Sequence, residues 1–256
     1  MVRSLEEYKL NAEPAAQLRL LDLQAVDTRL DQIAYAKSHS AEAAALADAD
    51  ASVLTIADTV VAAATLVSDL EREQAKADAD VDLVRERAKK DRELMDSGSI
   101  SSAKQLESLG HELESLAKRQ ADLEEVELEV MERLEGAQKA YAQLEGELAE
   151  LRSTREALSA AVGAQFTQFD ADATAARSER DVISGELPAD LLKLYEKVRA
   201  DHGGVGAAPL HRGQCQGCHM QLTPTDIETI RASKPEEVIR CEECRRILVR
   251  TAESGL

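Results

Sequence analysis

The sequence has almost no aromatic residues, which excludes an ordinary globular core. Tryptophan is absent, and all aromatic residues together make up 2% of the 256-residue chain. Charged residues reach 31%, and alanine, leucine, glutamate and arginine dominate the first two-thirds, a mixture typical of long helices and coiled coils. We therefore expect a thin seam of leucine, valine and alanine, whose stabilisation accumulates along the helices.

Long unbroken apolar runs are also missing. No stretch approaches about 18 consecutive apolar residues, the length that crosses a bilayer, and the N-terminal MVRSLEEYKLNAEP has no apolar signal core. We therefore expect a cytoplasmic protein that does not enter the membrane. The sequence also shows no Ser-His-Asp arrangement, no paired carboxylates in a pocket-forming context and no open metal position. We therefore expect it not to be an enzyme and to have no small-molecule substrate.

Basic residues are too few to balance the acidic ones. The chain has 31 Lys and Arg against 49 Asp and Glu, a formal net charge of −18. From Gly203 onward the two signs balance at seven each, so the whole negative excess lies before that residue. An acidic surface of this kind repels nucleic acid and anionic membranes and keeps the protein soluble.

Apolar residues recur at alternating spacings of three and four from Leu106 to Phe169. About nine heptads in one register indicate a coiled coil. Gln120, Glu127 and Arg155 interrupt the apolar seam. We interpret them as register-setting or partly exposed positions, with a docking surface for a partner as the alternative.

An earlier part of the chain follows the same spacing less regularly. One phase runs from Leu23 to Ile33 and another from Val53 to Ala88, while the alanine-rich residues 41–51 between them blur the register. A change of heptad phase alters the supercoil locally and can bend the paired helices.

The segment Asp96-Ser-Gly-Ser-Ile-Ser-Ser102 separates the two periodic regions. Glycine flanked by serine ends a helix readily, so we place the tip of a hairpin at residues 96–102. Folding back at Gly98 pairs positions whose numbers sum to about 196, which sets Ile56 beside Tyr141. We predict a mainly α fold with a long antiparallel coiled-coil hairpin over residues 1–184. The alternative is one uninterrupted helix that dimerises.

The heptad pattern decays after Phe169, and Ser184-Gly-Glu-Leu-Pro188 breaks the helix. Because proline suits the first turn of a helix, we expect a docking helix within residues 185–202. His202-Gly-Gly-Val-Gly206 then reads as a flexible joint, without the following helix and Lys-Ser/Thr of a phosphate-binding loop. Residues 203–256 form the last unit.

All four cysteines lie in that last unit, as two Cys-x-x-Cys pairs: Cys215, Cys218, Cys241 and Cys244. Two such turns complete a tetrahedron of thiolates, the set that Zn²⁺ favours. We therefore predict one structural Zn²⁺ in a small C-terminal β zinc ribbon. A redox dithiol is the rival interpretation, which the missing βαβ context disfavours. His211 and His219 are expected to be surface residues, and Gly213 and Gly217 to give the first pair backbone freedom.

The residues around the cysteines fit a ribbon. We expect one hairpin from residues 205–210 and 220–222 and another from residues 237–240 and 247–249, with Thr223 capping a short helix between them. Five arginines of the ribbon are candidate contacts for nucleic acid or a partner: Arg212, Arg240, Arg245, Arg246 and Arg250.

These motifs resemble a family of bacterial coiled-coil proteins with a C-terminal four-cysteine zinc ribbon, often catalogued as predicted nucleic-acid-binding or zinc-ribbon proteins. Besides both cysteine pairs, the matching segments are Leu20–Leu30, Lys104–Glu114, Pro188–Glu196, His202–Gly204, Leu222–Pro224 and Arg246–Leu248. The resemblance implies a helical hairpin with the ribbon at its open end. It also implies adaptor or chaperone roles like those of relatives linked to flagellar assembly, type III secretion and an alternative sigma factor. One departure is Arg245, where relatives usually have glycine.

Two functions follow from the sequence. The first is a non-enzymatic zinc-ribbon coiled-coil adaptor or chaperone-like protein that binds proteins through its acidic helices. The alternative is a nucleic-acid-binding regulator that uses the basic face of the ribbon. The scarcity of aromatic residues for base stacking and the acidic helices favour the first.

Overall fold

The computed structural model describes residues 10–256, so the segment 1–9, on which most of the signal-sequence expectation rests, lies outside the described part. Contacts divide the chain into two units. One is Ala44–Ala160, and the other combines Met1–Ala43 with Ala161–Leu256.

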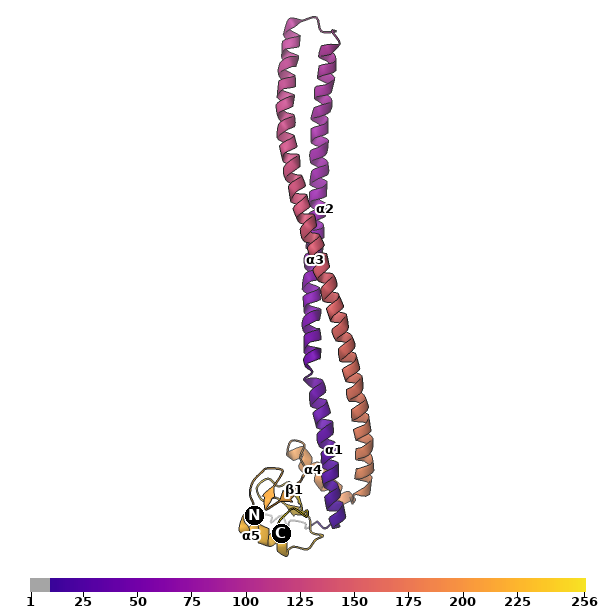
Figure 1. Ribbon diagram of the computed structural model, residues 1–256, viewed down its shortest axis with the longest axis vertical. Coiled ribbons are helices and arrows are strands. Elements are labelled where there is room, and N and C mark those ends of the chain that lie inside the picture. Colours follow the sequence, from indigo (N-terminus) through magenta and orange to yellow (C-terminus); the bar gives the residue numbers. More distant parts are fainter. Residues whose placement is uncertain (1–9) are drawn as a thin grey trace, which may run out of the picture. The chain divides into compact units, whose positions relative to one another are not determined.

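The unit Ala44–Ala160 is an antiparallel pair of long helices. Helix α2 spans Ala41–Asp96 and helix α3 spans Ala103–Glu186. Figure 1 shows α2 turning back into α3 through a short loop, in which Gly98 has a φ of 62°. This left-handed conformation suits glycine. The prediction of a mainly α, long helical hairpin is confirmed.

The seam between α2 and α3 follows the predicted heptads. Buried seam residues are few: Leu70, Ala77 and Val81 on α2, with Leu109, Val130, Leu134 and Leu148 on α3. Most other predicted seam positions are half-buried, whereas Leu106 near the tip and Arg155 are exposed. The hairpin therefore buries a narrow apolar line rather than a thick core.

The prediction of which α2 and α3 residues lie opposite each other is wrong. Near the tip, Arg87 Nη2 bonds Glu112 at 2.9 Å, a pair whose numbers add to 199. Farther along, Arg155 bonds Asp50 at 2.7 Å, and those numbers add to 205. Ile56 therefore lies level with residues near 150 instead of Tyr141. The helices end at Asp96 and begin again at Ala103, which moves the centre of the turn past Gly98.

Within residues 10–256, one helical stretch is long and apolar enough to cross a membrane by length and composition. It is Pro14–Asp96, and none of its most apolar 18-residue window is buried. The mean hydropathy is high around Ala51–Ser68, where Asp58 is the one charged residue. This window is not an unbroken apolar run, because Asp58 and several Ser and Thr residues interrupt it. The sequence pattern therefore did not predict it.

The other unit packs the ribbon against helices. Helix α1 (Pro14–Ser38), the last turns of α3 and helix α4 (Ala189–Asp201) surround a shared core with two strands of the ribbon. Its fully buried side chains include Leu20, Leu23, Leu191, Tyr195, Ile247 and Val249. Residues 10–12 add an antiparallel bridge to residues 236–238, with Val238 N donating to Leu10 O at 2.9 Å.

A buried carboxylate holds α1, α3 and α4 together. Asp27 is 1% exposed and accepts a hydrogen bond from Arg180 Nε at 2.6 Å and from Tyr195 Oη at 2.7 Å. Arg199 Nε lies 3.3 Å from the same carboxylate. Burial, and then the bond to Asp27, raises the pKa of Tyr195, which keeps its hydroxyl a donor.

Residues 202–206 are not a flexible joint. Gln24 Oε1 accepts from Gly206 N at 2.7 Å, and Gln24 Nε2 donates to Gly204 O at 2.9 Å. Arg246 also donates to the carbonyl oxygens of His202 and Val205, both at 3.0 Å. These bonds satisfy the backbone of the segment and fix it to α1 and to the ribbon.

The ribbon contains a four-stranded sheet in the order β2-β1-β4-β3. Its strands are β1 (Ala207–His211), β2 (Gln214–Cys215), β3 (Ile239–Arg240) and β4 (Ile247–Val249). The hairpin of β3 and β4 was predicted. The predicted hairpin of residues 205–210 with 220–222 is wrong, because β1 pairs with β2 instead, and the parallel pairing of β1 with β4 was not predicted. Helix α5 (Pro224–Ala232) begins at the predicted cap, where Thr223 and Asp226 form a reciprocal capping box.

Candidate metal centre

Each cysteine pair lies in a turn with the same backbone hydrogen bonds. Cys215 N donates to Met220 O at 3.1 Å, and Cys241 N donates to Arg246 O at 2.9 Å. The residue after each pair bonds back: His219 N to Cys215 O and Arg245 N to Cys241 O, both at 2.8 Å. These two turns, which we call the first and second knuckles, therefore present their thiols in the same way.

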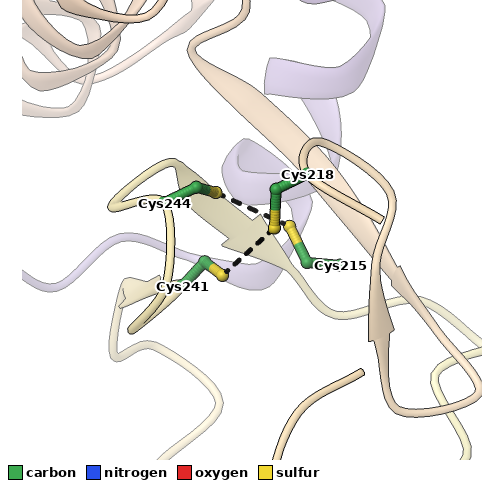
Figure 2. A group of neighbouring side chains, drawn as sticks. All are labelled: Cys215, Cys218, Cys241 and Cys244. Carbon is green, nitrogen blue, oxygen red and sulfur yellow. Dashed lines mark hydrogen bonds between the residues drawn. The ribbon is translucent and has the colours of Figure 1, made fainter. Parts of the chain in front are cut away.

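The four sulfur atoms converge on one point. They all lie within 4.8 Å of one another. Figure 2 shows Cys215 of the first knuckle facing Cys244 of the second, and Cys218 facing Cys241. The Sγ atoms of Cys215 and Cys244 are 3.9 Å apart, as are those of Cys218 and Cys241. Tetrahedral zinc with Zn–S bonds of about 2.3 Å separates its sulfurs by about 3.8 Å. The predicted residues thus form a C4 zinc ribbon site that fits one structural Zn²⁺.

Burial and hydrogen bonding act differently on the thiols. Burial raises the pKa of Cys215, and it raises the pKa of Cys241 to about 12. Burial also disfavours the thiolate of Cys244, but hydrogen bonds from the backbone and side chain of Arg246 outweigh it and lower the pKa to about 7. A bound cation stabilises thiolates outright. With four thiolate ligands no coordination position is left for a catalytic water.

The first knuckle needs Gly217 for close packing rather than for backbone freedom. A Cβ at this position would lie 2.8 Å from Arg246 Cδ and 3.0 Å from the Cβ of Ala208. Only Gly213 of the two predicted glycines has a positive φ, of 76°. Gly217 therefore allows the first knuckle to rest on the sheet and on Arg246.

The residue after each knuckle has a left-handed backbone. Arg245 and His219 both have a φ of 59°, a region that costs a residue with a side chain about 1–2 kcal/mol. This explains physically why glycine suits the position of Arg245. The arginine forms a long ion pair with Glu242, at 3.6 Å and largely exposed.

Replacing Arg245 with glycine is expected to stabilise the ribbon by about 0.5–1 kcal/mol, because the backbone strain is relieved. Thermal unfolding of the zinc-loaded protein measures the change. The matched control is Arg245→Ala, which removes the same side chain but keeps the strain and should give no gain. A glycine variant no more stable than the alanine variant would contradict the strain argument.

The five candidate contact arginines have different surroundings. Arg250 donates to the carbonyl oxygens of Lys234, Pro235 and Glu237 at 2.7–2.9 Å. Arg246 binds the carbonyls of residues 202 and 205. Arg240 Nε donates to Arg245 O at 2.8 Å, and Arg212 is exposed. Arg246 and Arg250 therefore serve the internal structure of the ribbon, a role that the sequence did not reveal.

The two histidines near the cysteines stand outside the sulfur cluster. Within the described residues, the metal-binding group contains the four cysteines alone. His219 is exposed, and His211 Nδ1 lies 3.2 Å from Glu253. Both fit the predicted surface positions.

Two family models match this arrangement of helices and cysteines. Residues 23–203 match a CT398-like coiled-coil hairpin domain, and residues 214–248 match a C4-type zinc ribbon domain. The chain belongs to the CT398-like hairpin family. The uncharacterized protein Rv2229c of Mycobacterium tuberculosis is 34% identical to this chain over 241 residues, covering 94% of this chain and 98% of the relative.

Solved structures show the same fold. A Mycobacterium smegmatis protein is 33% identical with a TM-score of 0.82, and the match covers 94% of this chain and all of that one. CT398 of Chlamydia trachomatis is 18% identical with a TM-score of 0.67, over 93% and 98% of the two chains. This chain thus combines the hairpin and the ribbon.

Proposed function

We propose that this protein is a non-enzymatic cytoplasmic adaptor that binds other proteins through its acidic helices. The observation that carries the proposal is the closed set of four thiol ligands, which fits a structural metal and leaves no position for a substrate. The ribbon then acts as a clamp at the base of α1 and α4. The long exposed helical surface is the part available for a partner.

The charge distribution supports a protein partner over nucleic acid. Residues 44–160 hold 27 acidic and 14 basic side chains, a net charge of −13, which repels phosphates. On the ribbon, Arg246 and Arg250 are occupied by backbone carbonyls. The basic face available for phosphate contacts is therefore smaller than the sequence suggests.

Photo-crosslinking in native cells tests the adaptor function. A photoreactive amino acid is placed at an exposed position of each part: Leu83 on α2, Leu128 on α3 and Met220 on the ribbon. We expect a defined protein partner to crosslink from a helix position and to survive nuclease treatment of the lysate.

The nucleic-acid alternative predicts a different result. Capture would disappear after nuclease treatment, and the purified protein would bind single-stranded RNA at about 50 mM salt with a steep loss by about 200 mM. We expect no measurable binding under either condition. Salt-sensitive binding that Arg212→Ala weakens would overturn the proposal.

A further inference from the structure

One stretch of α2 is unusually poor in charged residues for this chain. Between Ala51 and Ser68 there is a single charged residue, Asp58, although 31% of the whole chain is charged. Leu54 is 68% exposed and Val61 is 65% exposed. The seam positions of the same stretch are different residues, such as the half-buried Ile56 and Val60.

The exposed residues repeat with the spacing of a coiled-coil seam. Their positions alternate by three and four residues, and all are exposed: Ala51, Leu54, Asp58, Val61, Thr65 and Ser68. We call these six residues the α2 outer face. Alternating three and four spacing is the pattern that lets a second helix pack along the first, and small side chains at Ala51 and Ser68 allow its backbone to approach closely. The α2 outer face therefore has the form of a second helix-binding stripe.

Acidic residues predominate along this part of α2. From residue 44 to residue 71, α2 carries five acidic residues and no lysine or arginine: Asp48, Asp50, Asp58, Asp69 and Glu71. Asp50 pairs with Arg155 at 2.7 Å, and Asp69 pairs with Arg72. Asp58, in the middle of the α2 outer face, forms no ion pair within residues 10–256. A cationic side chain of a partner could form an ion pair with this carboxylate.

We propose that the α2 outer face binds a basic amphipathic helix of a partner protein. The proposal rests on the adaptor function and gives the chemical class of its partner. Apolar side chains of the partner, at heptad spacing, pack on Leu54 and Val61. A lysine or arginine of the partner pairs with Asp58. A second copy of this chain would bring two units of charge −13 together, and anionic lipid is repelled in the same way.

A synthetic helix tests the surface without knowledge of the natural partner. The probe is a fluorescent peptide of about 18 residues made of Leu, Ala and Lys, with leucines at alternating spacings of three and four. Its affinity for the full-length, zinc-loaded protein is measured by anisotropy. We expect the double variant Leu54→Gln/Val61→Gln to bind at least about tenfold more weakly, because two buried anchors are lost.

Two controls separate a built surface from simple attraction to an acidic protein. Leu83→Gln removes an equally exposed leucine, 69% exposed, elsewhere on α2 and should leave the affinity unchanged. A peptide of the same composition in scrambled order should bind at least about tenfold more weakly than the probe. Equal binding by both peptides, or an equal loss in both variants, would overturn the proposal. Circular dichroism checks that all variants keep their helices.

Other occupants of the face give distinct results. A dimer in sedimentation that Leu54→Gln/Val61→Gln abolishes would overturn the proposal in favour of self-association. Binding to zwitterionic phosphatidylcholine vesicles that the same variant abolishes would overturn it in favour of a membrane. If the crosslinked native partner binds this variant as well as the original protein, the site is wrong while the adaptor function stands.

Discussion

Replacing Cys241 with serine is expected to unfold the ribbon while the helices of residues 44–160 remain folded. Cys241 is 1% exposed and belongs to a ribbon core of seven buried residues. A core this small does not fold unaided. Zinc supplies about 10–16 kcal/mol of apparent binding free energy in isolated zinc fingers, so the loss of one thiolate removes most of what holds the ribbon together.

Three measurements check this result. Elemental analysis should give one zinc per chain for the original protein and less than a tenth of that for Cys241→Ser. Limited proteolysis should cut residues 203–256 of the variant first, and circular dichroism should retain most of the helix signal. His211→Ala, which alters a histidine near Cys215 in the sequence, should keep its zinc. A Cys241→Ser protein with stoichiometric zinc and a protease-resistant ribbon would refute four-cysteine coordination.

Replacing Asp27 with alanine is expected to destabilise the unit of α1, α4 and the ribbon by about 3–5 kcal/mol, the cost of removing one partner from a buried ion pair. The change leaves Arg180 and Arg199, whose side chains are 24% and 23% exposed, without this carboxylate. It also removes the acceptor of the buried Tyr195 hydroxyl, and an unsatisfied buried donor adds to the loss.

An exposed carboxylate on the same helix provides the control. Asp31 pairs with Arg199 at 2.7 Å but is 53% exposed, so Asp31→Ala should cost at most about 1 kcal/mol. The two variants are compared by urea unfolding, with hydrogen exchange of the amides of α1 and α4 as the readout. This readout reports on the unit in which both residues lie. Equal losses would mean that Asp27 does not hold the three helices together.

The hairpin was predictable because its information is local. Positions such as Leu109, Val130 and Leu148 recur at heptad spacing, and they are the buried residues of α3. The glycine and serines of residues 96–102 end one helix and start the next without help from distant contacts. The cysteines were equally clear, because two-residue spacing brings two thiols of one turn to the same centre.

The level at which α2 and α3 pair was not predictable in the same way. A seam that repeats every heptad brings apolar side chains opposite apolar side chains again when one helix slides by one repeat. The position is decided by pairs such as Arg155 with Asp50 and Arg133 with Glu73. Acidic residues are so frequent in this chain that each arginine had several possible partners.

The base of α1 was missed because its contacts join the two ends of the sequence. Gln24 and Asp27 are polar residues between Leu23 and Leu30, inside the heptad pattern of α1. A polar residue inside an apolar pattern is a sign of a specific buried partner. Those partners, Tyr195 and Gly206, lie 168 and 182 residues away, and no local pattern identifies them.

The bridge between residues 10–12 and residues 236–238 can form only after nearly the whole chain has been synthesised. Gln17 bonds the carbonyl of Pro235, 218 residues later, a distance that a ribosome covers in roughly 10–40 s. During that interval Leu20 and Leu23 lack the ribbon residues of their core, such as Ile247 and Val249. Residues 44–160 are already synthesised by then. A chain released before Val238 would keep its hairpin and expose the foot of α1 to aggregation and proteases.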